Sequence, residues 1–121
     1  MILIVVGDNA FRKHLHTLFE SCYGFSRCVE ARNGGEAIAK TKQLLPRLAI
    51  VDFSLAETNG LQVARELKEI APELPIFLLT PDNYLDIEKE ALSCGITAVF
   101  SKQDMATLLA NARSVCGFGT P

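Results

Sequence analysis

The chain has 121 residues, of which 49% are hydrophobic, and this size and composition fit one compact domain with a single core. Its formal net charge is −2 and its charged residues are scattered without a basic run, which argues against direct binding to nucleic acid or to an anionic membrane. The first apolar run is too short to span a bilayer and lacks signal-peptide features, and the four cysteines lack metal-ligand spacing, so we expect a cytoplasmic protein with reduced thiols.

Short apolar segments alternate with segments of helical periodicity along the chain. In chain order, each predicted strand is followed by a predicted helix: residues 2–6 by 11–22, 27–31 by 37–45, 48–51 by 61–70, 76–79 by 85–92, and 98–100 by 105–115. Several of the strands are almost entirely apolar, as expected when both faces of a sheet are covered. The regular alternation predicts a doubly wound α/β domain, with a five-stranded parallel sheet, right-handed crossovers and helices on both faces.

The start of the first predicted helix carries a lone acid in the segment GDNAF, residues 7–11. Asp8 is suited either to bind a metal ion or to cap the helix, and Asn9 is a second residue that can cap it. Farther along this helix, Arg12, His14 and His16 are interpreted as a solvated, basic face rather than as metal or phosphorelay residues.

Four polar residues follow four different predicted strands: Asp8 the first, Asp52 the third, Thr80 the fourth and Lys102 the fifth. Because ligands of open parallel sheets bind at the carboxyl ends of the strands, we expect these side chains to converge at one edge. Each one alone has an ordinary explanation as a cap, a turn residue or a solvated lysine. The combination is what the chemistry of a phosphorylated carboxylate needs: an acid nucleophile, a metal and a cation.

Asp52 is the candidate nucleophile, since a carboxylate oxygen can attack a phosphoryl group in line when the charge on the phosphoryl oxygens is neutralised. Mg²⁺ prefers a few carboxylate and carbonyl oxygens and keeps several waters, so Asp8 and Asp52 could hold it together with one loop carbonyl. Lys102 would pair with one phosphoryl oxygen, and the Thr80 hydroxyl would donate to another.

The chain resembles the receiver domain of two-component response regulators over nearly its whole length, in the segments VVGDNAFRKHL, AIVDFSLAETNGLQVARELK, PIFLLT and AVFSK. The resemblance implies a flavodoxin-like (βα)5 fold with the sheet order 2-1-3-4-5. It also implies a receiver domain over residues 1–116, with residues 117–121 as a tail or the start of a linker.

The same resemblance assigns roles to residues of this chain. It makes Asp52 the phosphoacceptor, which receives its phosphoryl group from a histidine kinase or a phosphotransfer protein. It makes Asp8 a direct ligand of Mg²⁺. The backbone carbonyl of Ser54 would be the remaining protein ligand of the metal. Thr80 would be the switch hydroxyl and Lys102 the lysine that pairs with the phosphoryl group.

Receivers commonly use the face of the fourth helix, fifth strand and fifth helix for partners, which implies a homodimer, a downstream protein or a C-terminal output domain here. Tyr84, Leu85, Val99 and Phe100 are the candidate residues of this switch and partner surface. An ordinary aromatic at a helix start is an equal interpretation of Tyr84, and Leu85 could instead face the core.

Five positions depart from the receiver pattern. Gly7 stands where the family usually has a second acid, and Ala56 stands where a proline is usual. Pro81 lacks the backbone N–H that the residue after the threonine usually offers to the phosphoryl group. The usual aromatic position is occupied by Val99, and the neighbouring Phe100 is expected to face the opposite side of the strand. Gln103 replaces a common proline. The missing acid at position 7 predicts weaker Mg²⁺ binding.

A phosphorylation-controlled switch, rather than an enzyme, is the leading hypothesis. The second is a pseudo-receiver that binds protein partners independently of phosphate, as Gly7, Ala56 and Pro81 together suggest. An aspartate-nucleophile phosphatase is disfavoured because Ser54 stands where such enzymes usually have a second acid. A flavodoxin-like nucleotide binder is disfavoured because GDNAF is not a phosphate loop rich in Ser, Thr and Gly.

Overall fold

The computed structural model describes residues 1–21, 27–55, 58–81 and 85–116, and contains a single five-stranded sheet. All neighbouring strands are parallel, and their order is β2-β1-β3-β4-β5. The strands are β1 (Ile2–Val5), β2 (Cys28–Ala31), β3 (Leu48–Asp52), β4 (Ile76–Thr80) and β5 (Ala98–Ser101). The helices are α1 (Asn9–Ser21), α2 (Gly34–Leu44), α3 (Gly60–Ile70), α4 (Leu85–Ser93) and α5 (Met105–Cys116). The predicted fold class and strand order are both confirmed.

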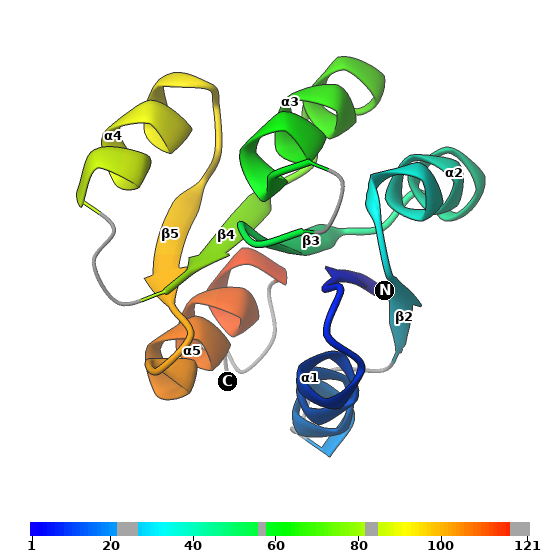
Figure 1. Ribbon diagram of the computed structural model, residues 1–121. Coiled ribbons are helices and arrows are strands. Elements are labelled where there is room, and N and C mark those ends of the chain that lie inside the picture. Colours follow the sequence, from blue (N-terminus) through cyan, green and yellow to red (C-terminus); the bar gives the residue numbers. More distant parts are fainter. Residues whose placement is uncertain (22–26, 56–57, 82–84, 117–121) are drawn as a thin grey trace.

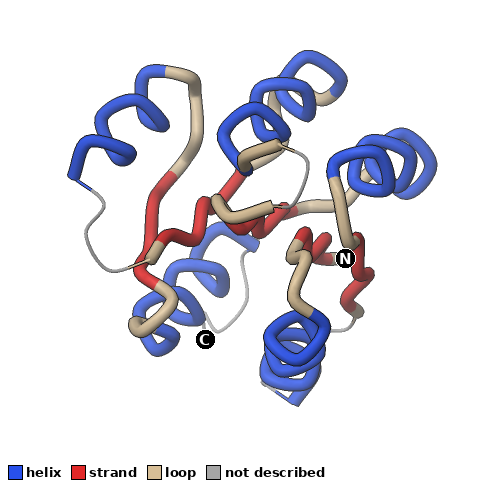
Figure 2. Tube along the Cα trace, viewed as in Figure 1, coloured by secondary structure: helices blue, strands red, loops and turns tan. Residues whose placement is uncertain are grey.

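The helices form a layer on each side of the sheet (Figure 1; Figure 2). Helices α1 and α5 cover one face, and α2, α3 and α4 cover the other. Successive residues of a strand point to opposite faces, so Ile4 packs on the α1 side and Val5 on the α2 side, both fully buried. Burial on both faces explains why the strands are almost continuously apolar.

Side chains at the helix starts explain where α2 and α3 begin. Asn33 accepts a hydrogen bond from the N–H of Glu36 at 2.9 Å and caps α2, which therefore starts three residues before the predicted position. Asn59 accepts from the N–H of Gln62 at 2.9 Å and caps α3.

None of the helices in the described ranges is both long and apolar enough to span a membrane.

Val99 and Phe100 face opposite sides of the sheet, as predicted, but both belong to the core. Val99 is 8% exposed and packs on the α4 side, whereas Phe100 is 6% exposed and meets Phe77 edge to face with ring centroids 5.0 Å apart. Neither offers an exposed partner surface in this conformation, because α4 and α5 cover the strand on both faces. Tyr84 and the Leu85 side chain lie outside the described residues.

Candidate functional site

The carboxyl ends of β3 and β5 bring the candidate nucleophile and the candidate cation into contact. Asp52 is the last residue of β3, and Lys102 follows the last residue of β5. The Nζ atom of Lys102 lies 2.9 Å from Oδ2 of Asp52. The Asp52 side chain is 2% exposed and the Lys102 side chain is 32% exposed, so the ion pair is buried on the carboxylate side and reaches solvent on the lysine side. Their predicted convergence is confirmed.

The loop after β3 folds back onto Asp52. The second carboxylate oxygen of Asp52, Oδ1, accepts the N–H of Ser54 at 3.0 Å. The N–H of Gly60 donates to the carbonyl of Phe53 at 2.8 Å, and Ser54 forms an isolated bridge with Asn59. A Cβ atom at Gly60 would lie 2.2 Å from the carbonyl oxygen of Asp52, so only glycine allows this approach. The loop thus fixes the backbone and the carboxylate of Asp52 together.

Lys102 has a second neighbour that the sequence did not reveal. Its Nζ atom lies 5.3 Å from the centroid of the Phe11 ring, which comes from the first turn of α1. A cation over an aromatic face at this distance is attracted to the ring. The backbone N–H of Lys102 donates to the carbonyl of Thr80 at 3.0 Å. The ammonium group is therefore held between Asp52 and Phe11 while its loop is anchored to β4.

Thr80 ends β4 at the same edge but directs its hydroxyl elsewhere. The residue is fully buried, and Oγ1 donates to the carbonyl of Phe100 at 3.4 Å. A hydrogen bond of this length is weak, so little is lost when the hydroxyl turns to another acceptor. Pro81, which follows, is exposed and has no N–H to offer.

Asp8 caps α1. Its Oδ2 atom accepts the N–H of Phe11 at 2.8 Å, and its carbonyl accepts the N–H of Arg12 at 2.9 Å. The open choice between Asp8 and Asn9 is resolved in favour of Asp8, because the Asn9 side chain is bonded to Arg12 instead. Capping uses one carboxylate oxygen and does not prevent the exposed Asp8 from also contacting a cation.

A metal ion at this edge would find a sparse set of ligands. Within the described ranges, no group of three or more His, Cys, Asp and Glu side chains is arranged to hold a metal. Asp8, Asp52 and the Ser54 carbonyl are oxygen donors, which suit an Mg²⁺ ion that retains several waters. Gly7 has no side chain that could bind the metal. A Cβ atom there would meet nothing closer than the Arg32 carbonyl oxygen at 3.7 Å. Packing therefore does not prevent an acid at position 7.

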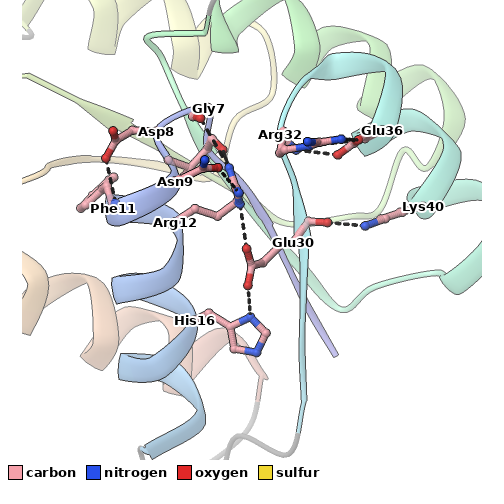
Figure 3. A network of polar contacts seen from close by, with 11 residues as sticks. Gly7, Asp8, Asn9, Phe11, Arg12, His16, Glu30, Arg32, Glu36 and Lys40 are labelled. Carbon is pink, nitrogen blue, oxygen red and sulfur yellow. Dashed lines mark hydrogen bonds and ion pairs between the residues drawn. The ribbon is translucent and has the colours of Figure 1, made fainter.

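Arg12 is a buried charged residue at this end of the sheet. It is 5% exposed, and its Nη1 donates to the carbonyls of Val6 at 2.9 Å and Gly7 at 3.4 Å. Its Nη2 donates to the Asn9 side chain, and its Nε lies 2.7 Å from Oε1 of Glu30 on β2 (Figure 3). The interpretation of Arg12 as part of a solvated face was wrong, because Glu30 supplies a partner from another element.

His16 belongs to the same network. Its Nδ1 lies 2.6 Å from Oε2 of Glu30, and its Nε2 lies 2.8 Å from Glu20. Partial burial alone would lower the pKa of His16, but the hydrogen bonds and charges of Glu20 and Glu30 outweigh it and raise that pKa. Burial would likewise raise the pKa of Glu30, yet Arg12 and His16 lower it. His14 is exposed, as predicted, whereas His16 is half-buried against Glu30, so the prediction of a solvated side chain was wrong for His16.

We expect the stabilisation that His16 provides to depend on pH. Because its pKa is raised above 6.5 in the folded protein, the contribution is complete below the unfolded pKa and is lost as pH rises through the folded pKa. His16→Gln should therefore lower the free energy of unfolding by about 0.5–1 kcal/mol near pH 5.5 and by less near pH 8.5. Urea unfolding at both pH values measures this, with the exposed His14→Gln as control. An equal loss at both pH values would contradict it.

The two cysteines whose side chains the structure describes, Cys28 and Cys94, do not contribute to the site. Cys28 is buried on β2, and burial raises the pKa of its thiol to about 12. A thiol in this state is a poor nucleophile and a poor metal ligand. Cys28 and Cys94 are both free, in line with the predicted reduced thiols.

Comparison with known proteins gives one consistent result. Residues 2–113 match the family described as the response regulator receiver domain. A protein named putative transcriptional regulator from Pseudomonas aeruginosa is 32% identical over 115 residues, which cover 94% of this chain and 55% of that protein. The photosynthetic apparatus regulatory protein RegA from Rhodobacter capsulatus is 31% identical over 120 residues, which cover 99% of this chain and 64% of RegA.

The solved structures agree on the fold. The receiver domain of NtrX from Brucella abortus superposes with a TM-score of 0.86 at 23% identity, covering 97% of this chain and 98% of that domain. The chain spans only about half to two thirds of the length of the two curated relatives above, whereas it spans nearly all of this isolated domain.

Proposed function

The chain belongs to the response regulator receiver domain family, and from this premise we propose that it is a phosphorylation-controlled switch in which Asp52 accepts a phosphoryl group from a histidine kinase or a phosphotransfer protein. The observation that supports the proposal best is the contact between Asp52 and Lys102, 2.9 Å apart at the carboxyl edge of the sheet. Receiver domains of this family are signalling switches, so we expect no turnover of an independent substrate.

In the proposed reaction, a carboxylate oxygen of Asp52 forms a bond to phosphorus as the bond from phosphorus to the donor nitrogen breaks. The departing imidazole nitrogen keeps the electron pair and takes up a proton from solvent, which leaves a neutral histidine. Lys102, which now pairs with Oδ2 of Asp52, would pair with an oxygen of the transferred group. Asp8, Asp52 and the Ser54 carbonyl would hold Mg²⁺, which supplies positive charge that offsets the charge of the phosphoryl group.

Phosphorylation would be signalled through β4 and β5. The Thr80 hydroxyl would leave the Phe100 carbonyl, to which its present bond is 3.4 Å long, and donate to the new phosphoryl oxygen. Thr80 and Phe100 lie on neighbouring strands, and Phe100 packs on the α5 side. The change would reach the surface formed by α4, β5 and α5, where we place a partner protein, a second copy or an output domain. A receiver domain over residues 1–116 followed by a linker fits the greater length of the transcriptional relatives.

Incubation with acetyl phosphate and Mg²⁺, followed by intact-mass measurement, tests the proposal. Wild type should gain one phosphoryl group, and Asp52→Asn, which keeps the shape of the side chain but not the nucleophile, should gain none. No gain in either protein would favour the alternative, a binding module that works without phosphate. An equal mass gain in wild type and Asp52→Asn would show that another residue accepts the phosphoryl group.

The missing acid at position 7 should be measurable. Gly7→Asp is expected to bind Mg²⁺ about 10-fold more tightly than wild type, because a further carboxylate can hold the ion directly or through water. The open space around a Cβ atom at Gly7, with the nearest atom 3.7 Å away, allows the substitution. Titration of Mg²⁺ followed by amide NMR shifts gives the affinity, and Gly7→Asn is the uncharged control. Equal affinity of Gly7→Asp and wild type would show that position 7 does not limit metal binding.

A further inference from the structure

Arg12 connects three elements at the loop that presents Asp8. The guanidinium contacts the carbonyls of Val6 and Gly7 at the end of β1, the Asn9 side chain at the start of α1, and Glu30 on β2. Asp8 lies between Gly7 and Asn9, so the residues on both sides of it are bonded to the same buried group (Figure 3). Among the described residues, the hydrogen bond that holds the Asp8 side chain is the one that caps α1, from the N–H of Phe11.

We propose that Arg12 is a positioning residue, which holds the loop of residues 6–9 so that the Asp8 carboxylate faces the carboxyl edge of the sheet and can bind the cation needed at Asp52. This inference rests on the proposed function of the Asp52 site. Arg12 does not touch that site's reacting atoms; it acts through the loop backbone.

The composition of the loop explains why it needs such a support. Gly7 lacks a side chain that could pack against neighbouring residues, and glycine has more backbone freedom to lose than any other residue. Gly7 and Asp8 are both exposed, so packing contributes little to their order. Hydrogen bonds from a fixed guanidinium to two successive carbonyls restrict this freedom directly. A metal site with only two carboxylates depends more on how those carboxylates are held in place than a site with more ligands does.

The network also explains how a buried charge is tolerated. Glu30 neutralises Arg12, with Nε and Oε1 2.7 Å apart, and Glu30 is itself held by His16 and, through its carbonyl, by Lys40. Burial opposes the ionised form of Glu30, but Arg12 and His16 outweigh it and lower the pKa of this carboxyl. The guanidinium therefore has a fixed, charged partner on β2, and the loop is tied to the sheet.

A purely structural role for Arg12 predicts different behaviour. Leu15 and Phe19 are fully buried on the same side of α1 and hold the helix on the sheet by apolar contact. Loss of Arg12 should therefore leave α1 in place and loosen mainly the loop. A structural contact alone would lower the free energy of unfolding without changing the affinity of the folded protein for Mg²⁺.

The test compares wild type with Arg12→Met and Glu30→Gln, and uses the exposed Lys13→Met as a matched control. Mg²⁺ affinity is followed by amide NMR shifts, and phosphorylation by acetyl phosphate is followed over a range of Mg²⁺ concentrations. We expect Arg12→Met to weaken Mg²⁺ binding about 10-fold, as loss of an outer support of a metal ligand typically does. The phosphorylation rate at saturating Mg²⁺ should stay close to that of wild type. Glu30→Gln should show a smaller shift, and Lys13→Met none.

Unchanged Mg²⁺ affinity in folded Arg12→Met would overturn the inference, whatever the change in stability. If that variant does not fold, Glu30→Gln decides, because it removes the charge partner and keeps hydrogen-bonding groups; unchanged affinity there overturns the inference equally. Failure of the proposed function is a separate result. It appears as a wild type that takes up no phosphoryl group, and the Mg²⁺ titration still decides the role of Arg12.

Discussion

Gly60→Ala is expected to lower the free energy of unfolding by about 2–3 kcal/mol, the cost of forcing an atom into a closely packed site. The added Cβ would lie 2.2 Å from the carbonyl oxygen of Asp52, 2.8 Å from its carbonyl carbon and 2.9 Å from Cα of Phe53. These are backbone atoms of a central strand and its loop, so they cannot move aside cheaply. Urea unfolding measures the loss, and slower phosphorylation should accompany it because the shift displaces Asp52.

Gly7→Ala is the matched control, since it makes the same chemical change at the same edge of the sheet. Its Cβ would meet nothing closer than 3.7 Å, and the position has no left-handed backbone conformation. We expect its stability to stay within about 0.5 kcal/mol of wild type, or to rise slightly because the unfolded chain loses freedom. A Gly60→Ala protein as stable as Gly7→Ala would show that the loop after β3 does not need its close approach to Asp52.

Lys102→Met is expected to reduce the rate of phosphorylation by acetyl phosphate about 100-fold, the typical effect of removing one group that stabilises charge in a transition state. The variant keeps the approximate length of the side chain but loses the cation, which lies 5.3 Å from the centroid of the Phe11 ring. Asp52, which is 2% exposed, then has no charged partner 2.9 Å away and nothing to offset the incoming phosphoryl charge on that side. Rates are read from the growth of the phosphorylated species by intact mass.

Lys102→Arg separates charge from geometry, because it retains a cation but replaces a compact ammonium by a planar group. We expect it to lie between wild type and Lys102→Met. A Lys102→Met protein that is phosphorylated at the wild-type rate would contradict the role assigned to the contact with Asp52.

The sequence was sufficient to predict the architecture and the central contact. Alternating apolar and amphipathic segments require a parallel sheet covered on both faces, and the carboxyl ends of such a sheet lie at one edge. Asp52 and Lys102 meet at this edge as predicted, although they are fifty residues apart in the chain. The period of two along β5 also predicted that Val99 and Phe100 face opposite sides.

The sequence was not sufficient where two elements decide a side chain's environment. Arg12 was read as solvated because its partner, Glu30, lies on β2, and nothing within α1 reveals it. One signal was present: Arg12 precedes Leu15 by three residues and Phe19 by seven, which puts it on the buried face of the helix. Such a position for a charged residue indicates a buried ion pair.

The orientation of individual side chains could not be predicted from the sequence either. Position alone placed Thr80 at the edge, but not its hydroxyl on the Phe100 carbonyl. The choice between Asp8 and Asn9 as the cap of α1 required the 2.8 Å bond from the N–H of Phe11 to Oδ2 of Asp8. Ala56, Tyr84 and residues 117–121 lie outside the described residues, so their predicted roles stay predictions.

The most direct test of the central claim is to locate the phosphoryl group. After reaction with acetyl phosphate and Mg²⁺, borohydride reduces an acyl phosphate to an alcohol, and tandem mass spectrometry of the peptides then identifies the carboxylate that carried it. We predict reduction at Asp52 alone, and only in protein that was treated with acetyl phosphate and Mg²⁺ before borohydride was added. Reduction at Asp8 or any other acid, or an unreduced Asp52 in protein that has gained a phosphoryl group, would contradict this account.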